Sequence, residues 1–218
     1  MRNKYEELSG DTLRHLLDPD SLSLVIVDVQ NDFCPGGALA VTDGDKIIPN
    51  INELIRVMSE KGALIVASRD WHPADSISTN PHFVNNWPVH CIQNTNGADF
   101  SPSLVTPDIE IIISKGTSGL DDGYSAFEGK TDKGETLNEV FDIDEVNQLV
   151  VTGLATDFCV KATVLDALKR ENPLTVILVT DAIAGVNIEP DASEKAIAEM
   201  LEAGAIIANT KEVCDALS

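Results

Sequence analysis

The chain has 218 residues, of which 43% are hydrophobic and 23% are charged, and this length and composition fit one globular domain. Its 36 acidic side chains outnumber 15 basic ones, which gives a formal net charge of −21. Such a surface repels the phosphate backbone of nucleic acids and anionic lipid headgroups, so neither nucleic-acid nor membrane partners are expected.

The N-terminal segment mixes charged side chains with leucines and lacks the apolar stretch of a signal peptide. Since no segment offers the ~20 apolar residues of a membrane-spanning helix, we expect a cytoplasmic protein. Apolar residues at roughly helical spacing predict a helix or a pair of turns within residues 4–17. The expected organisation is an N-terminal helical extension, residues 1–20, followed by one domain, residues 21–218.

Short apolar stretches recur along the chain, and the first, SLSLVIVDV, is typical of a strand that is buried on both faces. Six strands are predicted in this way, at residues 21–29, 62–68, 109–115, 147–153, 174–180 and 204–210. Helical spacing of apolar residues predicts helices between them, at residues 45–60, 157–169 and 191–202. This alternation indicates the α/β class, as a single-domain, three-layer α/β/α fold with a six-stranded, mostly parallel sheet.

Two connections are longer than ordinary turns, residues 69–108 and 116–135, and both are rich in Pro, Gly, Asn, Asp and Ser. Each follows a predicted strand and therefore leaves the carboxyl edge of the sheet, where open α/β folds bind ligands. Because long loops in compact domains usually carry function, we expect the site at this edge.

Four polar residues stand at the ends of predicted buried strands or shortly after them: Asp28, Asp70, Lys115 and Cys159. The parallel strands should bring these residues together. Each alone also has a structural explanation, since an aspartate caps a turn, a lysine is a solvated charge and a cysteine is a small buried hydrophobe.

Cys159 is the most informative of the four, because it lies at the start of the predicted helix 157–169, where free N–H groups and the helix dipole favour a thiolate. Lys115 would lower the pKa of the thiol further, and Asp28 would take the thiol proton and return it to a leaving amine. These three residues form a candidate catalytic triad without a histidine.

A second group of residues indicates a metal site. Asp70 and His72 lie one residue apart at a strand end, and His90 follows, which supplies carboxylate and imidazole ligands suited to Zn, Fe or Mn. His82 falls in the same loop, so three of the four histidines of the chain lie between positions 72 and 90. Three protein ligands suffice if water completes the coordination shell.

Five segments of the sequence resemble one known family. They are VDVQNDFCPGGALAV (27–41), RDWHP (69–73), WPVHCIQNTNGADF (87–100), KGTSGLDDGYSAFEG (115–129) and VTGLATDFCVKATVLDAL (151–168). The chain is similar to the nicotinamidase and pyrazinamidase branch of the isochorismatase-like cysteine hydrolases over about residues 22–210. The resemblance implies the isochorismatase-like hydrolase fold.

The resemblance also implies a role for individual residues. The triad of the family falls on Asp28, Lys115 and Cys159, the same residues that their positions in the chain select. The other implied roles are metal binding by Asp70, His72 and His90, substrate contact by Phe33, Trp87 and Tyr124, and oxyanion binding by the backbone N–H groups of Ala155 and Cys159. A cis peptide bond between Leu154 and Ala155 is implied as well. Without the resemblance, the three aromatic residues would be ascribed to core packing.

The activity implied by the resemblance is hydrolysis of nicotinamide to nicotinate and ammonia through a thioester on Cys159, a reaction of NAD salvage. Pyrazinamide is a further expected substrate. One divalent metal ion is the expected cofactor, with zinc first and iron or manganese as alternatives, and no organic cofactor is expected. The oligomeric state stays open, a homo-oligomer included.

One position departs from the family pattern DWHPxxHxSF, because Ser76 replaces its second histidine. A neutral hydroxyl is a poor metal ligand, so three outcomes are open. Water fills the position, His82 or Asp75 takes it, or the metal binds more weakly. We hypothesise that His82 substitutes, because it lies in the same loop and has no other assigned role.

Three other functions remain open. The nearest is a metal-independent cysteine amidohydrolase of the same fold that acts on a carbamoyl or ureido substrate. The serine at position 76 slightly favours this alternative, whereas Asp70, His72 and His90 disfavour it. A vinyl-ether hydrolase like isochorismatase would leave Cys159 without a purpose, and a non-catalytic ligand-binding protein would not need the complete triad.

Overall fold

The computed structural model describes residues 10–85, 87–118 and 123–218. Its centre is one sheet made of β1 (Leu22–Val27), β2 (Leu64–Asp70), β3 (Ile111–Lys115), β4 (Gln148–Leu154), β5 (Thr175–Ala184) and β6 (Ile206–Ala208). The strand order is β3-β2-β1-β4-β5-β6, and all neighbouring strands are parallel. The predicted α/β class and six-stranded sheet are confirmed, and the sheet is fully parallel.

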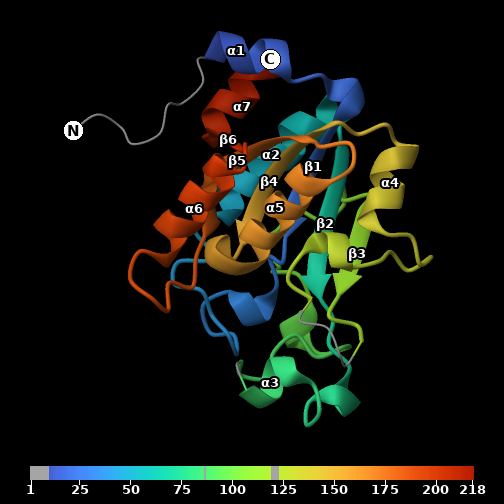
Figure 1. The fold of residues 1–218 in the computed structure, drawn as a ribbon, viewed down its shortest axis with the longest axis vertical. Helices are drawn as coiled ribbons and strands as arrows, with labels where there is room; N and C mark the ends of the chain where they lie inside the picture. The colour runs from blue at the N-terminus through green and yellow to red at the C-terminus, as the bar shows by residue number, and fades with distance from the viewer. Residues whose placement is uncertain (1–9, 86, 119–122) are drawn as a thin grey trace.

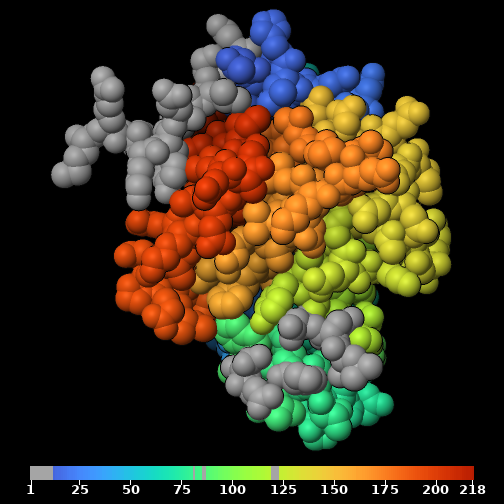
Figure 2. Space-filling view, viewed as in Figure 1, coloured from blue at the N-terminus to red at the C-terminus, as the bar shows by residue number. Residues whose placement is uncertain are grey.

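Helices cover both faces of this sheet (Figure 1). The helices are α1 (Gly10–Leu16), α2 (Ile48–Glu60), α3 (Pro81–Asn85), α4 (Leu137–Ile143), α5 (Lys161–Lys169), α6 (Ala192–Glu202) and α7 (Thr210–Ala216). One apolar core contains side chains of α1, α2 and α7, and a second contains side chains of α4, α5 and α6. In the space-filling view, the second group of helices hides the sheet beneath it (Figure 2). The three-layer prediction is therefore confirmed.

Strand β1 shows how the sequence produces these layers. All six of its residues are buried. Because side chains alternate along a strand, Leu24 and Ile26 enter the first core, whereas Val25 and Val27 enter the second. Each such side chain contributes about 1.5–3 kcal/mol by leaving water. An unbroken apolar stretch is therefore what a central parallel strand requires.

The carboxyl ends of β1, β2 and β3 point toward the end of the molecule that carries α3 (Figure 1). The long connections that follow β2 and β3 gather there, together with the turn after β1. This arrangement positions residues from distant parts of the sequence at one edge of the sheet.

Several boundaries differ from the sequence predictions. Strand β5 continues to Ala184, past an irregularity in its pairing with β4. The predicted helix 157–169 begins instead as a π-helical turn, Thr156–Val160, and becomes α-helical only at Lys161. Helices α4 and α7 were not predicted. Both begin with a capping box, a signal that was present at Thr136 and Asn209.

The N-terminal prediction falls partly outside the described residues, which begin at residue 10. Helix α1 packs against α7, and its Leu13 side chain is fully buried in the first core. The boundary between an extension and a domain at residue 20 stays a prediction. Within the described residues, no helix combines the length and apolar character needed to cross a membrane.

Candidate active site

Asp28 lies immediately after β1, where its backbone adopts a positive φ of 50°. Its carboxylate accepts a hydrogen bond from the Ser68 hydroxyl at 2.8 Å, and its backbone N–H donates to the Ser68 carbonyl at 3.2 Å. Ser68 of the neighbouring strand β2 therefore holds both the backbone and the carboxylate of Asp28.

Lys115 is the last residue of β3 and lies beside Asp70 in the register of β2 and β3. Its side chain is fully buried. The ammonium contacts Asp28 Oδ2 at 2.8 Å, donates to the Gly123 carbonyl at 2.6 Å and also donates to a carboxylate oxygen of Asp70. Its fourth contact is Cys159 Sγ, at 3.5 Å. One cation thus connects two carboxylates and a thiol.

Burial and charge act in opposite directions on these groups. Burial raises the pKa of Asp28 to about 6, with a further increase from Asp70 and an opposing effect from Lys115. For Lys115, burial lowers the pKa, but the two neighbouring carboxylates outweigh it and hold the pKa well above its usual value. Lys115 therefore stays protonated, whereas Asp28 titrates near neutral pH.

Cys159 lies in the π-helical turn between β4 and α5 and is 7% exposed. We expected a lowered thiol pKa, and this expectation is wrong. Burial raises the pKa of Cys159 well above its usual value, and Asp28 raises it too, although Lys115 acts in the opposite direction as predicted. The resting group is therefore a neutral thiol that must lose its proton during the reaction.

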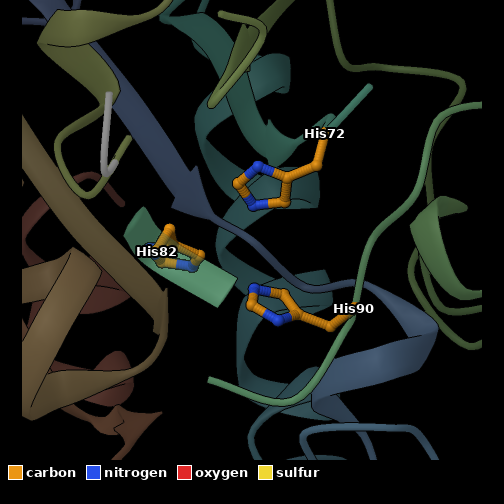
Figure 3. Close-up of side chains that lie close together, drawn as sticks. All are labelled: His72, His82 and His90. Carbon is orange, nitrogen blue, oxygen red and sulfur yellow. The ribbon is translucent and has the colours of Figure 1, made fainter. Parts of the chain in front are cut away.

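Three histidines, His72, His82 and His90, converge in a second cluster, as Figure 3 shows. Ligand nitrogens of His72, His82 and His90 lie within 4.8 Å of one another, and all three rings are buried. Asp70 adds a carboxylate, since its Oδ2 lies 3.8 Å from His72 Nε2 and 3.6 Å from His90 Nε2. The end of β2 and the loop that follows it thus bring four donors together.

The hydrogen bonds of two of these rings show which nitrogen faces the cluster. His72 Nδ1 lies 3.1 Å from the Gly116 carbonyl, and His90 Nδ1 lies 2.7 Å from the Pro88 carbonyl. Since a carbonyl only accepts, each Nδ1 carries the hydrogen and each Nε2 presents a lone pair. His72 Nε2 is buried and has no hydrogen-bond partner among the described residues. This arrangement suits a cation.

Gly116 is required for the position of His72. Its φ is +62°, and a Cβ atom there would lie only 2.4 Å from Cε1 of the His72 ring. Glycine therefore provides both the backbone conformation and the space that the imidazole occupies.

Ser76, which stands where the family pattern has a histidine, is buried, and its hydroxyl donates to the Pro73 carbonyl at 2.8 Å. Asp75, one of the two considered substitutes, is exposed. The structure instead brings His82, from α3, into the cluster with His72 and His90.

A pocket joins the thiol to the histidine cluster. Its lining residues are Phe33, Leu39, Asp70, His82, Trp87, His90, Tyr124, Leu154, Ala155, Phe158, Cys159 and Val186. The three predicted substrate-contact residues are therefore among its walls. Trp87 Nε1 donates to the Tyr124 hydroxyl at 2.9 Å, which connects two of them.

The implied oxyanion-hole residues also line this pocket. Ala155 directly precedes the π-helical turn, and Cys159 is the fourth residue of that turn. The peptide bond between Leu154 and Ala155 is cis, as the resemblance implied. The Ala155 carbonyl accepts hydrogen bonds from Phe158 N and Val160 N, which close the turn around Cys159.

Comparison with known proteins agrees with this geometry. The family model of the Isochorismatase domain matches residues 23–212 of this chain. The chain belongs to the isochorismatase family. Within this family it is 42% identical over 201 residues to a nicotinamidase of Escherichia coli (strain K12), a match that covers 85% of this chain and 93% of the relative.

Two solved structures of the family are similar as well. Pyrazinamidase of Pyrococcus horikoshii in complex with zinc is 46% identical, with a TM-score of 0.76 over 87% of this chain and 99% of the other. PnC1 from L. infantum in complex with nicotinate is 32% identical, with a TM-score of 0.78 over 90% of this chain and 96% of the other.

Some supporting residues were missed by sequence reasoning. Gln30 is fully buried, and its side chain bonds both the N–H and the carbonyl of Asp70, at 2.8 Å each. Ser68, Phe158 and Val186 were not singled out either. A polar side chain directly beside a buried apolar stretch, as at Gln30, was the available signal.

Proposed function

We propose that this chain is a nicotinamidase, a cysteine amidohydrolase that converts nicotinamide to nicotinate and ammonia and that also accepts pyrazinamide. The observation that carries the proposal is the Lys115 ammonium, which contacts both Asp28 and the Cys159 thiol at one end of an aromatic pocket. The similarity to nicotinamidases and to a pyrazinamidase supports the choice of substrate.

Asp28 is the proposed general base. One carboxylate oxygen lies within 4.8 Å of Cys159 Sγ, and a pKa of about 6 leaves the carboxylate ionised at neutral pH while keeping it a competent acceptor. Because the pKa of the thiol is raised, proton transfer to Asp28 accompanies attack of sulfur on the amide carbon. Asp28 then gives this proton to the departing nitrogen, and ammonia leaves.

Water completes the reaction. Asp28, ionised again, takes a proton from a water molecule that attacks the thioester carbonyl. The C–S bond then breaks, Asp28 returns this proton to the departing sulfur, and the acid product loses its own proton to solvent as nicotinate. In both steps the backbone N–H groups of Ala155 and Cys159 are the proposed donors to the carbonyl oxygen, which becomes negatively charged. Lys115 stays protonated throughout and offsets the charge on Asp28 and sulfur.

The proposed metal ligands are Asp70, His72 and His90, with His82 as the fourth. Lone pairs of two buried imidazole nitrogens face a carboxylate, which fits a divalent ion, and imidazole with carboxylate is a donor set of zinc. When bound, the ion supplies a fixed Lewis acid that orients the pyridine nitrogen of the substrate. Zinc is the proposed ion, in line with the similar pyrazinamidase that was solved with zinc.

A second cluster of possible ligands, Asp28, Asp70 and Cys159, has a different explanation. The Lys115 ammonium already contacts all three side chains. It provides there the positive charge that a metal would otherwise supply.

The pocket walls fit the flat ring of the substrate. Phe33, Trp87 and Tyr124 are the proposed contact residues, and aromatic faces bind a heteroaromatic ring through stacked or edge contacts. Such a pocket would hold the ring between the histidine cluster and Cys159.

The test is ammonia release from nicotinamide by purified protein, before and after chelation and again after zinc is restored. We expect activity that chelation removes and zinc restores. Cys159→Ala serves as the control for contaminating amidases. Absence of ammonia from metal-loaded protein would contradict the proposal and favour a carbamoyl or ureido substrate.

A further inference from the structure

Asp157 is a buried carboxylate that the mechanism above does not use. It is 7% exposed and lies in the same turn as the nucleophile, two residues before Cys159. Its Oδ1 accepts a hydrogen bond from Val186 N at 2.9 Å, and its Oδ2 accepts one from Asn187 N at 2.8 Å. Both oxygens therefore hold the loop that follows β5.

This loop needs such an anchor because the sheet no longer supports it. The paired residues of β4 and β5 end at Leu154 and Ala184. Beyond them, the backbone N–H groups of residues 186 and 187 find their acceptors on the Asp157 side chain instead of on a neighbouring strand. A carboxyl group has two oxygens, so it can accept both hydrogen bonds at once.

Gly185 gives independent evidence for the close fit. A Cβ atom at this position would lie 3.0 Å from Asp157 Oδ1 and 1.9 Å from the Ser193 hydroxyl oxygen. Asn187 anchors the other end of the loop, since its side-chain oxygen accepts from Ser193 N at 2.9 Å. The loop is therefore held between the nucleophile's turn and helix α6.

The anchored loop places Val186 in the active-site pocket. Val186 is partly buried and lines the same pocket as Cys159 and the aromatic residues Trp87 and Tyr124. Its apolar side chain is therefore one of the pocket walls.

We infer that Asp157 is a positioning residue. Its hydrogen bonds hold the loop after β5 in place, so that the Val186 side chain contacts the substrate ring. This inference rests on the proposed function and adds a determinant of substrate affinity to it. Asp157 acts through Val186 and not through the thiol, so its loss should change binding of the ring more than the chemistry at Cys159.

Asp157→Asn tests this role, because the amide keeps the shape but retains only one oxygen for two N–H donors. We expect KM for nicotinamide and Kd for nicotinate to rise about tenfold, equal to about 1.4 kcal/mol, with kcat changed less than about threefold. The rate at which iodoacetamide alkylates Cys159, followed by peptide mass spectrometry, should stay near the wild-type rate. Asp108→Asn removes an exposed charge and is the matched control.

Val186→Ala keeps the anchor intact and removes the wall. It should reproduce the higher KM and Kd, and the double variant Asp157→Asn/Val186→Ala should be no worse than the weaker-binding single variant. Additive effects, or an Asp157→Asn variant with slower alkylation and lower kcat at unchanged KM, would overturn the inference. So would a Val186→Ala variant with wild-type KM and Kd.

The two proposals can fail separately. Wild-type protein that neither binds nicotinate nor hydrolyses nicotinamide contradicts the proposed function, and this inference falls with it. Wild-type protein that does both, with Val186→Ala unchanged, contradicts this inference alone.

Discussion

Replacing His82 by alanine is expected to weaken zinc binding by at least about 100-fold. The structure brings His82 into one cluster with His72 and His90, and Asp70 lies beside it, so the substitution removes one of four donors. Residues that merely orient a metal ligand change metal affinity by about 10–100-fold. Loss of a ligand should therefore reach the upper end of this range or exceed it, which corresponds to about 2.7 kcal/mol.

The measurement is competition for zinc against a chromophoric chelator, with the bound metal counted by mass spectrometry. His15→Ala is the matched control, because His15 is exposed and belongs to α1, on a different part of the fold. Ser76→His in the His82→Ala background places a histidine where the family pattern has one, and it should recover at least about tenfold in affinity.

Zinc affinity of His82→Ala within threefold of that of His15→Ala would show that His82 is not a metal ligand. In that case Asp70, His72 and His90 with water would complete the shell, and the imidazole of His82 would only line the pocket. Because the readout is metal affinity, this result would be independent of whether nicotinamide is the substrate.

Three further predictions follow from the triad. Cys159→Ala should abolish turnover while zinc and nicotinate binding, measured by calorimetry, stay within threefold of wild type; joint loss of both would contradict its role as nucleophile only. The pH profile of kcat/KM for zinc-saturated enzyme should show an acid limb near pH 6, because the base Asp28 must be ionised and its pKa is raised to about 6. Below that pH the rate should fall about tenfold per unit, and a limb near pH 4 would argue against Asp28 as the base. Lys115→Met leaves the buried carboxylates of Asp28 and Asp70 without their cation. We therefore expect the free energy of unfolding, measured by urea denaturation, to fall by about 3–5 kcal/mol. A decrease of less than about 1 kcal/mol would contradict this account.

The zinc-free protein offers a related stability measurement. A ligand that binds only the folded state stabilises it in proportion to the logarithm of its concentration over Kd. We therefore expect the Tm of wild type to rise with added zinc and that of His82→Ala to rise much less. Equal shifts for both proteins would indicate that zinc acts elsewhere.

The sheet was predictable because a buried parallel strand imposes a strong local pattern. A short apolar run rich in β-branched residues, such as that of β1, is typical of a strand covered on both faces, so strand positions followed from single segments. Helices α4 and α7 escaped prediction since each is only seven residues long. Their apolar spacing spans about two turns, too few to show a helical period.

The sequence by itself determined the fold class, and it predicted that Asp28, Asp70, Lys115 and Cys159 meet at the carboxyl edge of the sheet, where the structure brings them together. These follow from local patterns and from the rule that parallel strands end at a common edge. The sequence also states the type of each group, whether carboxylate, amine, thiol or imidazole, because the type of a side chain does not depend on folding.

Only the tertiary structure decided how these groups affect one another. The raised pKa of Cys159 comes from burial among side chains far apart in sequence, a desolvation that no local pattern reveals. The same holds for the approach of His82 to His72 and for the contact of Asp157 with the loop after β5. The distance between two residues in a folded chain depends on the packing of every element between those residues. The sequence therefore identified the candidate groups but could not give the distances between them.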